Sequence, residues 1–229
     1  MMRIPNLGIM PASLLLAICL PCAAQTNAPP SLDKIGEAMS RTRTIFVRFA
    51  QERRLSLFNE PLRSEGFLCF QQPGRIRWET TAPYKSILVS DGSGTAQFEW
   101  TDEKWKKLDL GLGDALQNVL SQIAGVMNGR FAGDRRSYRA TLTNSADELV
   151  VTLVPQDEMT RKMMAAIEVY MTTDLTGVRR VVLRENGGDY TDIRFSEQFV
   201  NFEPPPKTFD RAAPVDLEKV RSAAAGAKP

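Results

Sequence analysis

The chain has 229 residues, a length that fits one domain, and carries 29 Lys and Arg residues against 27 Asp and Glu residues. This near balance of charge argues against nucleic acid as the main partner, because such partners require a basic surface. Histidine is absent, which excludes Ser-His-Asp and Cys-His nucleophile systems and His-ligated zinc. The sequence also lacks a Walker loop, a dinucleotide fingerprint and a G-x-S-x-G motif, so we expect no enzyme, no cofactor and no metal site.

Residues 1–24 have the pattern of a secretory signal. Arg3 provides a positive start, an apolar run extends from Ile9 to Leu20, and small residues precede a predicted cleavage site after Ala24. The run is too short to cross a bilayer, which needs ~20 apolar residues. We therefore expect export to the periplasm with removal of the signal.

A lipoprotein signal is the alternative reading of the same segment. Lipobox cleavage favours small residues just before the cysteine, whereas Ile18 precedes Cys19 and Pro21 precedes Cys22. We therefore expect soluble export without acylation. Cys69 is then the sole cysteine of the mature chain, so a disulfide within it is impossible, and its thiol is expected to be inert packing. Loss of Arg3 leaves 28 basic residues against 27 acidic ones, which gives no strong pull toward anionic membrane.

The mature chain opens with a predicted helix and a predicted strand. Leu32, Ile35 and Met39 have helical spacing, and Ser31 stands before them as an N-cap. Residues 45–52 then alternate in the manner of a strand with two usable faces.

The most informative stretch is residues 66–92, GFLCFQQPGRIRWETTAPYKSILVSDG. It has the pattern of three short strands separated by turns. A Pro-Gly pair follows the first strand, Pro83 breaks the chain after the second, and an Asp-Gly turn ends the third. The predicted strands cover residues 66–72, 75–79 and 87–89.

The period of the apolar residues changes in the middle of the chain. Residues 95–100 and 105–108 are predicted to be further strands, and residues 114–127 are predicted to be a helix that ends near Gly129. The helical stripe consists of Leu116, Val119, Leu120, Ile123 and Met127.

Strand patterns return in the last part of the chain. Residues 157–164 are predicted to be a short helical turn between two of these strands, and residues 186–189 a hairpin turn. From Arg211 the chain is Ala-rich and polar, and we expect a tail that can be loosely ordered. The strands predicted here cover residues 138–143, 148–154, 167–171, 178–184 and 190–195.

These elements predict an α+β fold. We expect about eight to eleven antiparallel strands in one curled sheet, because sequential strands joined by tight turns favour a single sheet over a sandwich. The order of the Pro-Gly turn, the Arg-x-Trp strand, the proline and ILVSDG resembles the LolA family of periplasmic lipoprotein carriers. The resemblance covers most of the mature chain and is specific mainly over residues 49–92.

The resemblance implies a fold and a division of the chain. It implies an incomplete antiparallel β-barrel with a few helices covering its concave face. Residues 1–24 are then the signal peptide, residues 25–210 a LolA-like half-barrel carrier domain, and residues 211–229 a polar, Ala-rich C-terminal tail.

Bulky apolar side chains that we assign to the inward face form the candidate site. By alternation alone they would equally well form an ordinary core between sheet and helices, whereas the resemblance implies a hydrophobic cavity that takes acyl chains. Methionines at 127, 159, 163 and 164 suit either reading, because unbranched thioethers repack around variable neighbours. The residues expected to bind ligand are Phe49, Leu68, Phe70, Ile76, Trp78, Leu88, Phe98, Trp100, Leu120, Ile123 and Met127.

One position departs from the family pattern. The lipoprotein carriers have an arginine just before the proline of the turn, which latches the sheet to lid carbonyls, whereas this chain has Gln72 before Pro73. Glutamine keeps two donors but has no charge, so a latch made by Gln72 would be weaker. Arg75 or Arg77 could substitute, but both are expected to face outward. The departure favours carriage of another envelope amphiphile, such as a glycolipid or a lipid-linked pigment.

The resemblance implies a periplasmic carrier that binds the acyl chains of lipoproteins, or another lipid or glycolipid, and shuttles them from the inner to the outer membrane. Its expected partners are an inner-membrane donor complex and an outer-membrane acceptor, and we expect a monomer. The alternative is a lipid-sensing regulatory binding module with a half-barrel fold. A hydrolase would need catalysis by carboxylates, and most of the acids stand beside Lys, Arg or turn residues, which is typical of a solvated surface.

Overall fold

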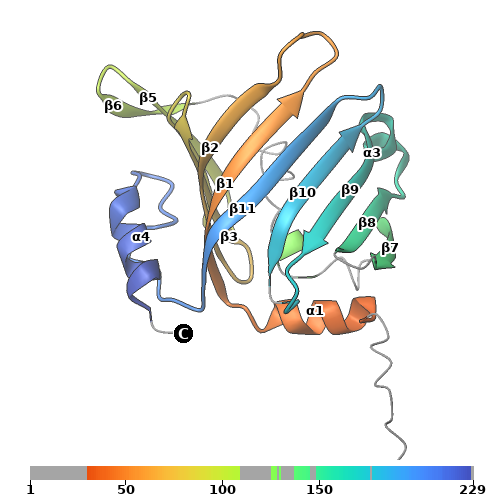
Figure 1. The fold of residues 1–229 in the computed structure, drawn as a ribbon. Coiled ribbons are helices and arrows are strands. Elements are labelled where there is room, and N and C mark those ends of the chain that lie inside the picture. The colour runs from red at the N-terminus through yellow and green to blue at the C-terminus, as the bar shows by residue number, and fades with distance from the viewer. Residues whose placement is uncertain are drawn as a thin grey trace, which may run out of the picture.

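A single curled antiparallel sheet of 11 strands forms the body of the molecule. The computed structural model describes residues 30–108, 125–127, 129, 137–144, 148–175 and 177–227. The strand order is β6-β5-β4-β3-β2-β1-β11-β10-β9-β8-β7, so the first long strand pairs with the last and the two halves of the chain meet at the centre of the sheet. The sheet is not closed into a barrel, and β6 and β7 form its two edges (Figure 1). The predicted incomplete barrel is confirmed.

The strand bounds follow the predicted turns closely. The β2–β3 hairpin contains the Pro-Gly pair, and the β4–β5 hairpin contains the Asp-Gly turn. The strands are β1 (Thr44–Arg54), β2 (Leu62–Gln71), β3 (Arg75–Ala82), β4 (Ser86–Ser90), β5 (Thr95–Thr101), β6 (Lys104–Leu108), β7 (Tyr138–Asn144), β8 (Leu149–Pro155), β9 (Met164–Met171), β10 (Val178–Glu185) and β11 (Tyr190–Val200).

Short helices with side-chain caps accompany the sheet. In α1 (Leu32–Ser40), the Ser31 hydroxyl accepts a hydrogen bond from the backbone N–H of Lys34, as the sequence predicted. In α3 (Glu158–Met163), Asp157 caps the N-terminus in the same way. Of the predicted helix over residues 114–127, residues 125–127 are helical, and residues 109–124 lie outside the described residues. The predicted signal peptide also lies outside them.

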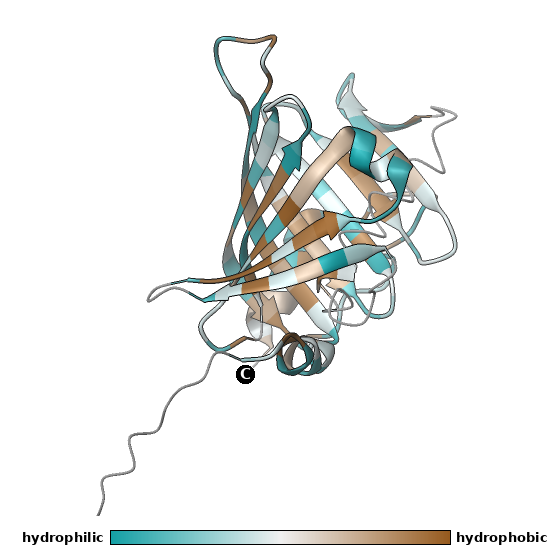
Figure 2. Ribbon diagram, turned by 90° about the vertical axis from the view of Figure 1, so that its right-hand side faces the viewer, coloured by the Kyte–Doolittle hydropathy of each residue, from teal (hydrophilic) through white to brown (hydrophobic). Residues whose placement is uncertain are grey.

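The two faces of the sheet bury different parts of the chain. The sheet curls away from the viewer of Figure 1, and α1 lies across one end of its concave side. Figure 2 shows hydrophobic residues along the middle of successive strands, with hydrophilic residues between them. Because side chains alternate along each strand, both faces of β1–β5 can bury apolar residues.

The last helix, α4 (Leu217–Gly226), packs on the convex side of the sheet. Val220 is 0% exposed and Ala224 is 1% exposed, and both belong to a cluster that includes Phe46 and Val89 of the sheet. The expectation of a loosely ordered tail is therefore wrong for residues 217–226. Within this Ala-rich segment, one face of helix α4 carries apolar residues that cover apolar residues on the convex side of the sheet.

Candidate functional site

An apolar wall lines the concave face of β1–β4. Leu68, Phe70 and Ile76 are 0% exposed, and they form one cluster with Ile45 and Val47 of β1. Trp78 and Leu88 pack against this cluster. We call the concave residues of these strands the apolar wall.

Met127 covers part of the apolar wall. It is 3% exposed, belongs to the same cluster as Leu68 and Ile76, and comes from the helical residues 125–127. The structure thus brings together seven of the residues expected from the sequence to bind ligand, namely Phe49, Leu68, Phe70, Ile76, Trp78, Leu88 and Met127. Leu120 and Ile123 lie outside the described residues.

A glycine allows two aromatic rings to pack side by side in the wall. Phe49 of β1 pairs with Gly66 of β2, and the Phe49 ring centroid lies 4.2 Å from that of Trp78. A Cβ at Gly66 would lie 2.9 Å from Cζ of Phe49 and would clash with the backbone carbonyl oxygen of Glu79. A ring lying over a strand glycine is a known way to cover its exposed backbone.

The concave face of β8–β10 continues the apolar surface and is covered by α1. Ile35 and Met39 are 0% and 1% exposed, and they pack against Val151, Ile167 and Val169. The cover of the concave face is therefore shared by α1 and residues 125–127 and 129.

These two covering segments meet through glycines. Gly129 has a φ of +66°, and a Cβ there would lie 3.0 Å from Cα of Gly36 in α1 and 3.0 Å from Cβ of Met39. Val126 joins the α1 cluster, while Met127 joins the apolar wall. Glycine is needed at 129 for both its backbone conformation and the close approach, which lets the cover form one connected piece.

The side chain of Gln72 links the sheet to the end of α1. Its Nε2 donates to the backbone oxygens of Ser40 at 3.2 Å and Thr42 at 3.0 Å. Ser40 is the last residue of α1, where carbonyl groups lack partners within the helix. The Gln72 amide thus donates to two carbonyl groups beside the cover without carrying a charge.

Phe98 and Trp100 correct the predicted site, because they lie on the convex face. In the register of the sheet, Trp78 pairs with Leu88 and Leu88 pairs with Gln97, so Gln97 is the concave residue of β5. Phe98 instead packs in the α4 cluster, and Trp100 is 40% exposed with its ring 5.3 Å from that of Trp105. Alternation in β5 was clear, but its inward face was assigned wrongly because both faces of this half-sheet are apolar.

The convex face holds a buried ion pair that the sequence did not predict. Arg77 and Glu79 are 2% and 6% exposed, and Nη2 of Arg77 lies 2.5 Å from Oε2 of Glu79. The same nitrogen donates to the backbone oxygen of Val215 at 2.6 Å. Burial raises the pKa of the Glu79 carboxyl, and the Arg77 guanidinium opposes this effect.

Arg77 was expected to face outward, and it does lie on the convex side, but the C-terminal segment buries it. The strand register, and not the sequence alone, carries the signal for this burial. Arg77 pairs with the apolar Cys69 and Val89 on neighbouring strands, which is an unusual setting for a solvated arginine. The thiol of Cys69 is buried on the same face, and burial raises its pKa to about 12.

The Asp-Gly turn after β4 also holds the C-terminal segment. Oδ2 of Asp91 accepts from Nε of Arg211 at 2.7 Å, and Ser93 Oγ accepts from Nη2 of Arg211 at 3.3 Å. Partial burial would raise the pKa of Asp91, but hydrogen bonds from Ser93, Arg211 and Gly94 outweigh it and lower that pKa. The turn that marks the motif in the sequence is thus a docking point in the structure.

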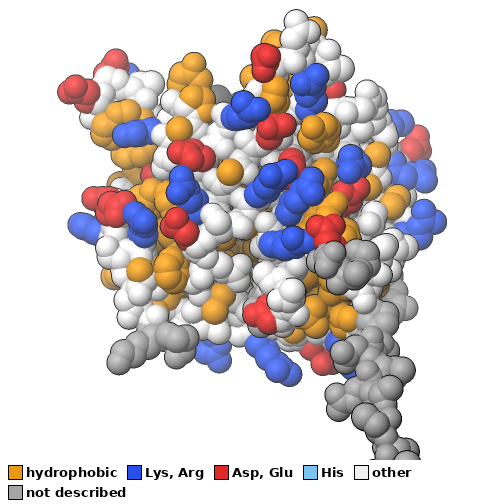
Figure 3. All heavy atoms as spheres, in the orientation of Figure 1, with side chains coloured by type: hydrophobic (Ala, Val, Ile, Leu, Met, Phe, Trp, Pro, Cys, Tyr) orange, Lys and Arg blue, Asp and Glu red, His pale blue; other side chains and the backbone are white. Residues whose placement is uncertain are grey.

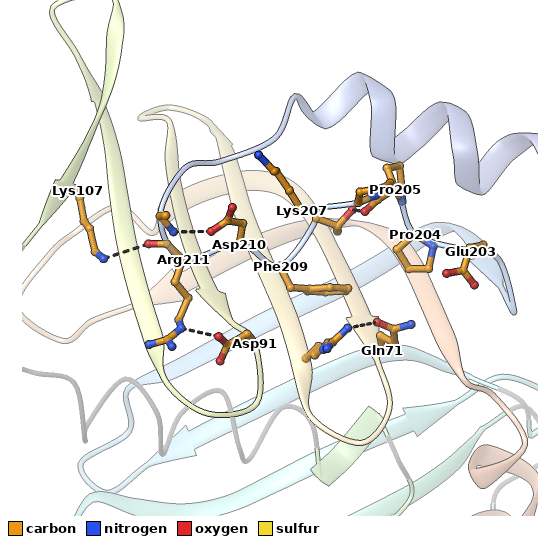
Figure 4. Close-up of a pocket in the computed structure, with 14 residues that line it drawn as sticks. Gln71, Asp91, Lys107, Glu203, Pro204, Pro205, Lys207, Phe209, Asp210 and Arg211 are labelled. Atoms are coloured by element: carbon orange, nitrogen blue, oxygen red, sulfur yellow. Dashed lines mark hydrogen bonds and ion pairs between the residues drawn. The ribbon is translucent and has the colours of Figure 1, made fainter.

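An open hollow of about 800 Å³ lies beside this docking point rather than at the apolar wall. Figure 4 shows that it is bordered by residues 203–211, Asp91, Lys107 and Gln71, with the Lys107 ammonium donating to the backbone oxygen of Arg211. Most of the residues that border it are charged or polar, among them Asp91, Lys107 and Arg211. In the part of the chain that the structure describes, no group of three His, Cys, Asp or Glu residues could hold a metal ion.

The sequence matches a known protein family over most of its length. The sequence model of the family described as outer membrane lipoprotein carrier protein LolA matches residues 40–212. An outer-membrane lipoprotein carrier protein of Dechloromonas aromatica is 25% identical over 213 residues, covering 88% of this chain and 91% of the relative. One of Chromohalobacter salexigens is 23% identical, covering 90% and 92%. A solved LolA superfamily protein of Nitrosomonas europaea has 11% identity and a TM-score of 0.44, covering 80% of this chain and 99% of that chain.

Proposed function

Since the chain belongs to the LolA family, we propose that it binds the acyl chains of an envelope amphiphile on the apolar wall and carries them between the two membranes. The observation that supports this most directly is the apolar surface of the concave face beneath a cover made of α1 and residues 125–127 and 129. The family match supports the proposal that this surface serves to carry a ligand.

The energetics of acyl burial favour a covered surface. Each methylene removed from water contributes ~0.8 kcal/mol, so a long chain strongly favours a site that hides it. The same wall needs a cover when it is empty, because exposed apolar patches promote aggregation. A cover that leaves when ligand enters offsets part of the binding free energy, and the cargo can then be passed on without ATP.

The contacts of the cover suit this exchange. Met127 packs on the apolar wall, and the α1 residues Ile35 and Met39 pack on the concave face of β8–β10, so all three bury apolar surface with uncharged side chains. The hydrogen bonds from Gln72 to Ser40 and Thr42 are neutral, and a typical neutral hydrogen bond contributes only ~1 kcal/mol. We infer that Gln72 is the latch of this cover and that it is weaker than an arginine latch.

The weaker latch bears on the class of cargo. A cover that opens at lower free energy needs less binding energy from its ligand, so an amphiphile with fewer or shorter acyl chains than a lipoprotein would suffice. We therefore propose a cargo drawn from lipoproteins or other envelope amphiphiles, with inner-membrane donor and outer-membrane acceptor partners.

We also propose export by the signal at residues 1–24, with cleavage after Ala24. Among the described residues, no helix has the length and apolar character needed to cross a bilayer.

The first test places a charge on the wall. We expect Leu68→Glu to abolish uptake of a fluorescent fatty-acid probe while the protein still melts cooperatively, because an opened cover lets water reach the carboxylate. Titration with the probe and thermal melting of the same samples measure both effects.

A convex residue supplies the control for Leu68→Glu. Val89 is 1% exposed but packs in the α4 cluster, so Val89→Glu should lower the melting temperature and leave probe uptake per folded molecule unchanged. If wild-type protein takes up no probe, or if both variants lose uptake equally, the concave face is an ordinary core.

The second test strengthens the latch. Gln72→Arg should form charge-assisted hydrogen bonds to the carbonyls of Ser40 and Thr42, which are about twice as strong as neutral ones. Because the closed state is then favoured by ~1 kcal/mol more, the apparent probe affinity should fall about fivefold and the melting temperature should rise. Gln71→Arg adds the same charge one residue earlier, where Gln71 borders the convex hollow, and should change neither quantity. Equal probe affinity in Gln72→Arg and wild type would show that Gln72 is not a latch.

A further inference from the structure

Large apolar side chains are exposed together at one end of the sheet, opposite α1. Leu57 is 84% exposed and Tyr84 is 83% exposed, values that no packed core residue approaches. Figure 3 shows hydrophobic side chains at tips along the upper edge of the molecule, and the topmost loop in Figure 2 has hydrophobic residues at its tip. We call this set the apolar rim, and it consists of Leu57, Phe58, Tyr84, Trp100, Met159 and Met163.

The antiparallel topology explains why these side chains share one end. The β1–β2 loop, the β3–β4 turn, the β5–β6 hairpin and α3, between β8 and β9, all connect strands at the edge opposite α1 (Figure 1). Each connection presents one or two apolar side chains. The rim therefore runs along most of the sheet, as separate tips and not as one patch.

Polar contacts hold these tips in place. The backbone N–H of Ser56 donates to Oδ1 of Asp189 at 2.7 Å, which joins the β1–β2 loop to the β10–β11 hairpin. The N–H of Asn186 donates to the backbone oxygen of Met163 at 3.1 Å, which joins that hairpin to α3. The N–H of Trp100 donates to the oxygen of Lys85 at 3.0 Å. The apolar side chains are thus exposed on loops whose backbones are held by hydrogen bonds. Little conformational entropy of the loops is therefore lost when the side chains bind a surface.

Charges of both signs lie beside the rim, and some of them form ion pairs. Arg53 and Glu185 lie 3.3 Å apart, and Lys162 and Glu158 lie 3.0 Å apart. Glu60 and Glu103 in the rim connections also balance Lys85 and Lys104, so we expect no strong cationic field that would select an anionic partner. Exposed Trp and Tyr side chains at the tips match the chemistry of the membrane–water interface, where their apolar rings and polar atoms are both satisfied.

We propose that the apolar rim inserts into the headgroup region of a zwitterionic phospholipid bilayer. A flat bilayer can receive several separated tips at once, whereas a protein partner would need a surface shaped to each of them. The proposal rests on the proposed carrier function, and it adds that the carrier rests on the membrane with the end opposite α1 facing the lipid.

Vesicles of phosphatidylcholine and phosphatidylethanolamine test this contact. Wild-type protein should sediment with them, and its tryptophan fluorescence, to which the exposed Trp100 contributes, should shift to shorter wavelength on binding. Leu57→Ser with Phe58→Ser should weaken the partition coefficient about tenfold, the factor expected when two side chains lose part of their apolar transfer energy. Val200 is 39% exposed at the other end of the sheet, so Val200→Ser should leave the partition coefficient unchanged.

Several results would overturn the proposal. It fails if wild-type protein does not sediment with the vesicles, if Val200→Ser weakens binding as much as the rim variant, or if 0.5 M salt abolishes binding. It also fails if the rim variant converts a wild-type dimer into a monomer without affecting vesicle binding, since the rim would then be a contact between copies. Fatty-acid probe uptake by the rim variant is measured in parallel. We expect the rim variant to lose vesicle binding and keep normal probe uptake, and Leu68→Glu to keep vesicle binding and lose probe uptake. These opposite patterns distinguish the membrane contact from the carrier function.

Discussion

Gly66→Ala should destabilise the protein more than any other small substitution in the apolar wall. The added methyl group would clash with the backbone oxygen of Glu79 and lie 2.9 Å from Cζ of Phe49. Backbone cannot move aside as a flexible side chain can, so strand β3 would have to separate from β2. We expect a loss of about 3 kcal/mol in the free energy of unfolding, measured by urea denaturation.

Two further variants show whether the backbone clash is the cause. Gly74→Ala introduces the same methyl group where no atom lies within 4 Å, so its free energy of unfolding should stay within about 0.5 kcal/mol of wild type. Gly66→Ala combined with Phe49→Leu relieves the ring contact but not the carbonyl contact. Full recovery in this double variant would mean that Phe49, and not β3, requires the glycine.

Arg77→Met should release α4 from the sheet and lower stability by about 3–5 kcal/mol. The substitution leaves the Glu79 carboxylate buried without its partner, and it removes the donor that holds the backbone oxygen of Val215. The released segment should become accessible to protease first, because Val220 and Ala224 of α4 lose their packing surface. Denaturation and limited proteolysis measure the two effects.

Replacing both partners of the ion pair provides the control. Glu79→Leu combined with Arg77→Met places two apolar side chains where Phe67 and Ile87 are the neighbours of residue 79. Such replacements of buried pairs are often neutral or stabilising, so the double variant should recover most of the loss. If Arg77→Met alone is as stable as wild type, the pair does not hold the C-terminal segment.

Local patterns in the sequence were sufficient for most elements of the fold. The β2–β3 and β4–β5 turns follow from Pro-Gly and Asp-Gly pairs, whose backbone preferences are local. Ser31 caps α1 as predicted, since a cap depends on residues three apart in the chain. Strand alternation likewise identified Leu68, Phe70 and Ile76 as one face of β2 and β3, and all three lie in the apolar wall.

The sequence did not determine which part of the molecule packs against each face of a strand. It specified that the residues of β5 alternate, but the sign of that alternation depends on register with β4, so Phe98 and Trp100 were assigned to the wrong side. The sequence also did not identify the partners of Arg77 and Asp91, because Val215 and Arg211 lie more than a hundred residues away along the chain. Secondary structure and turns are set by interactions between near neighbours and can be read along the chain. Contacts between distant segments decide which face of each strand is concave or convex and where α4 docks. These contacts form only when the sheet has curled.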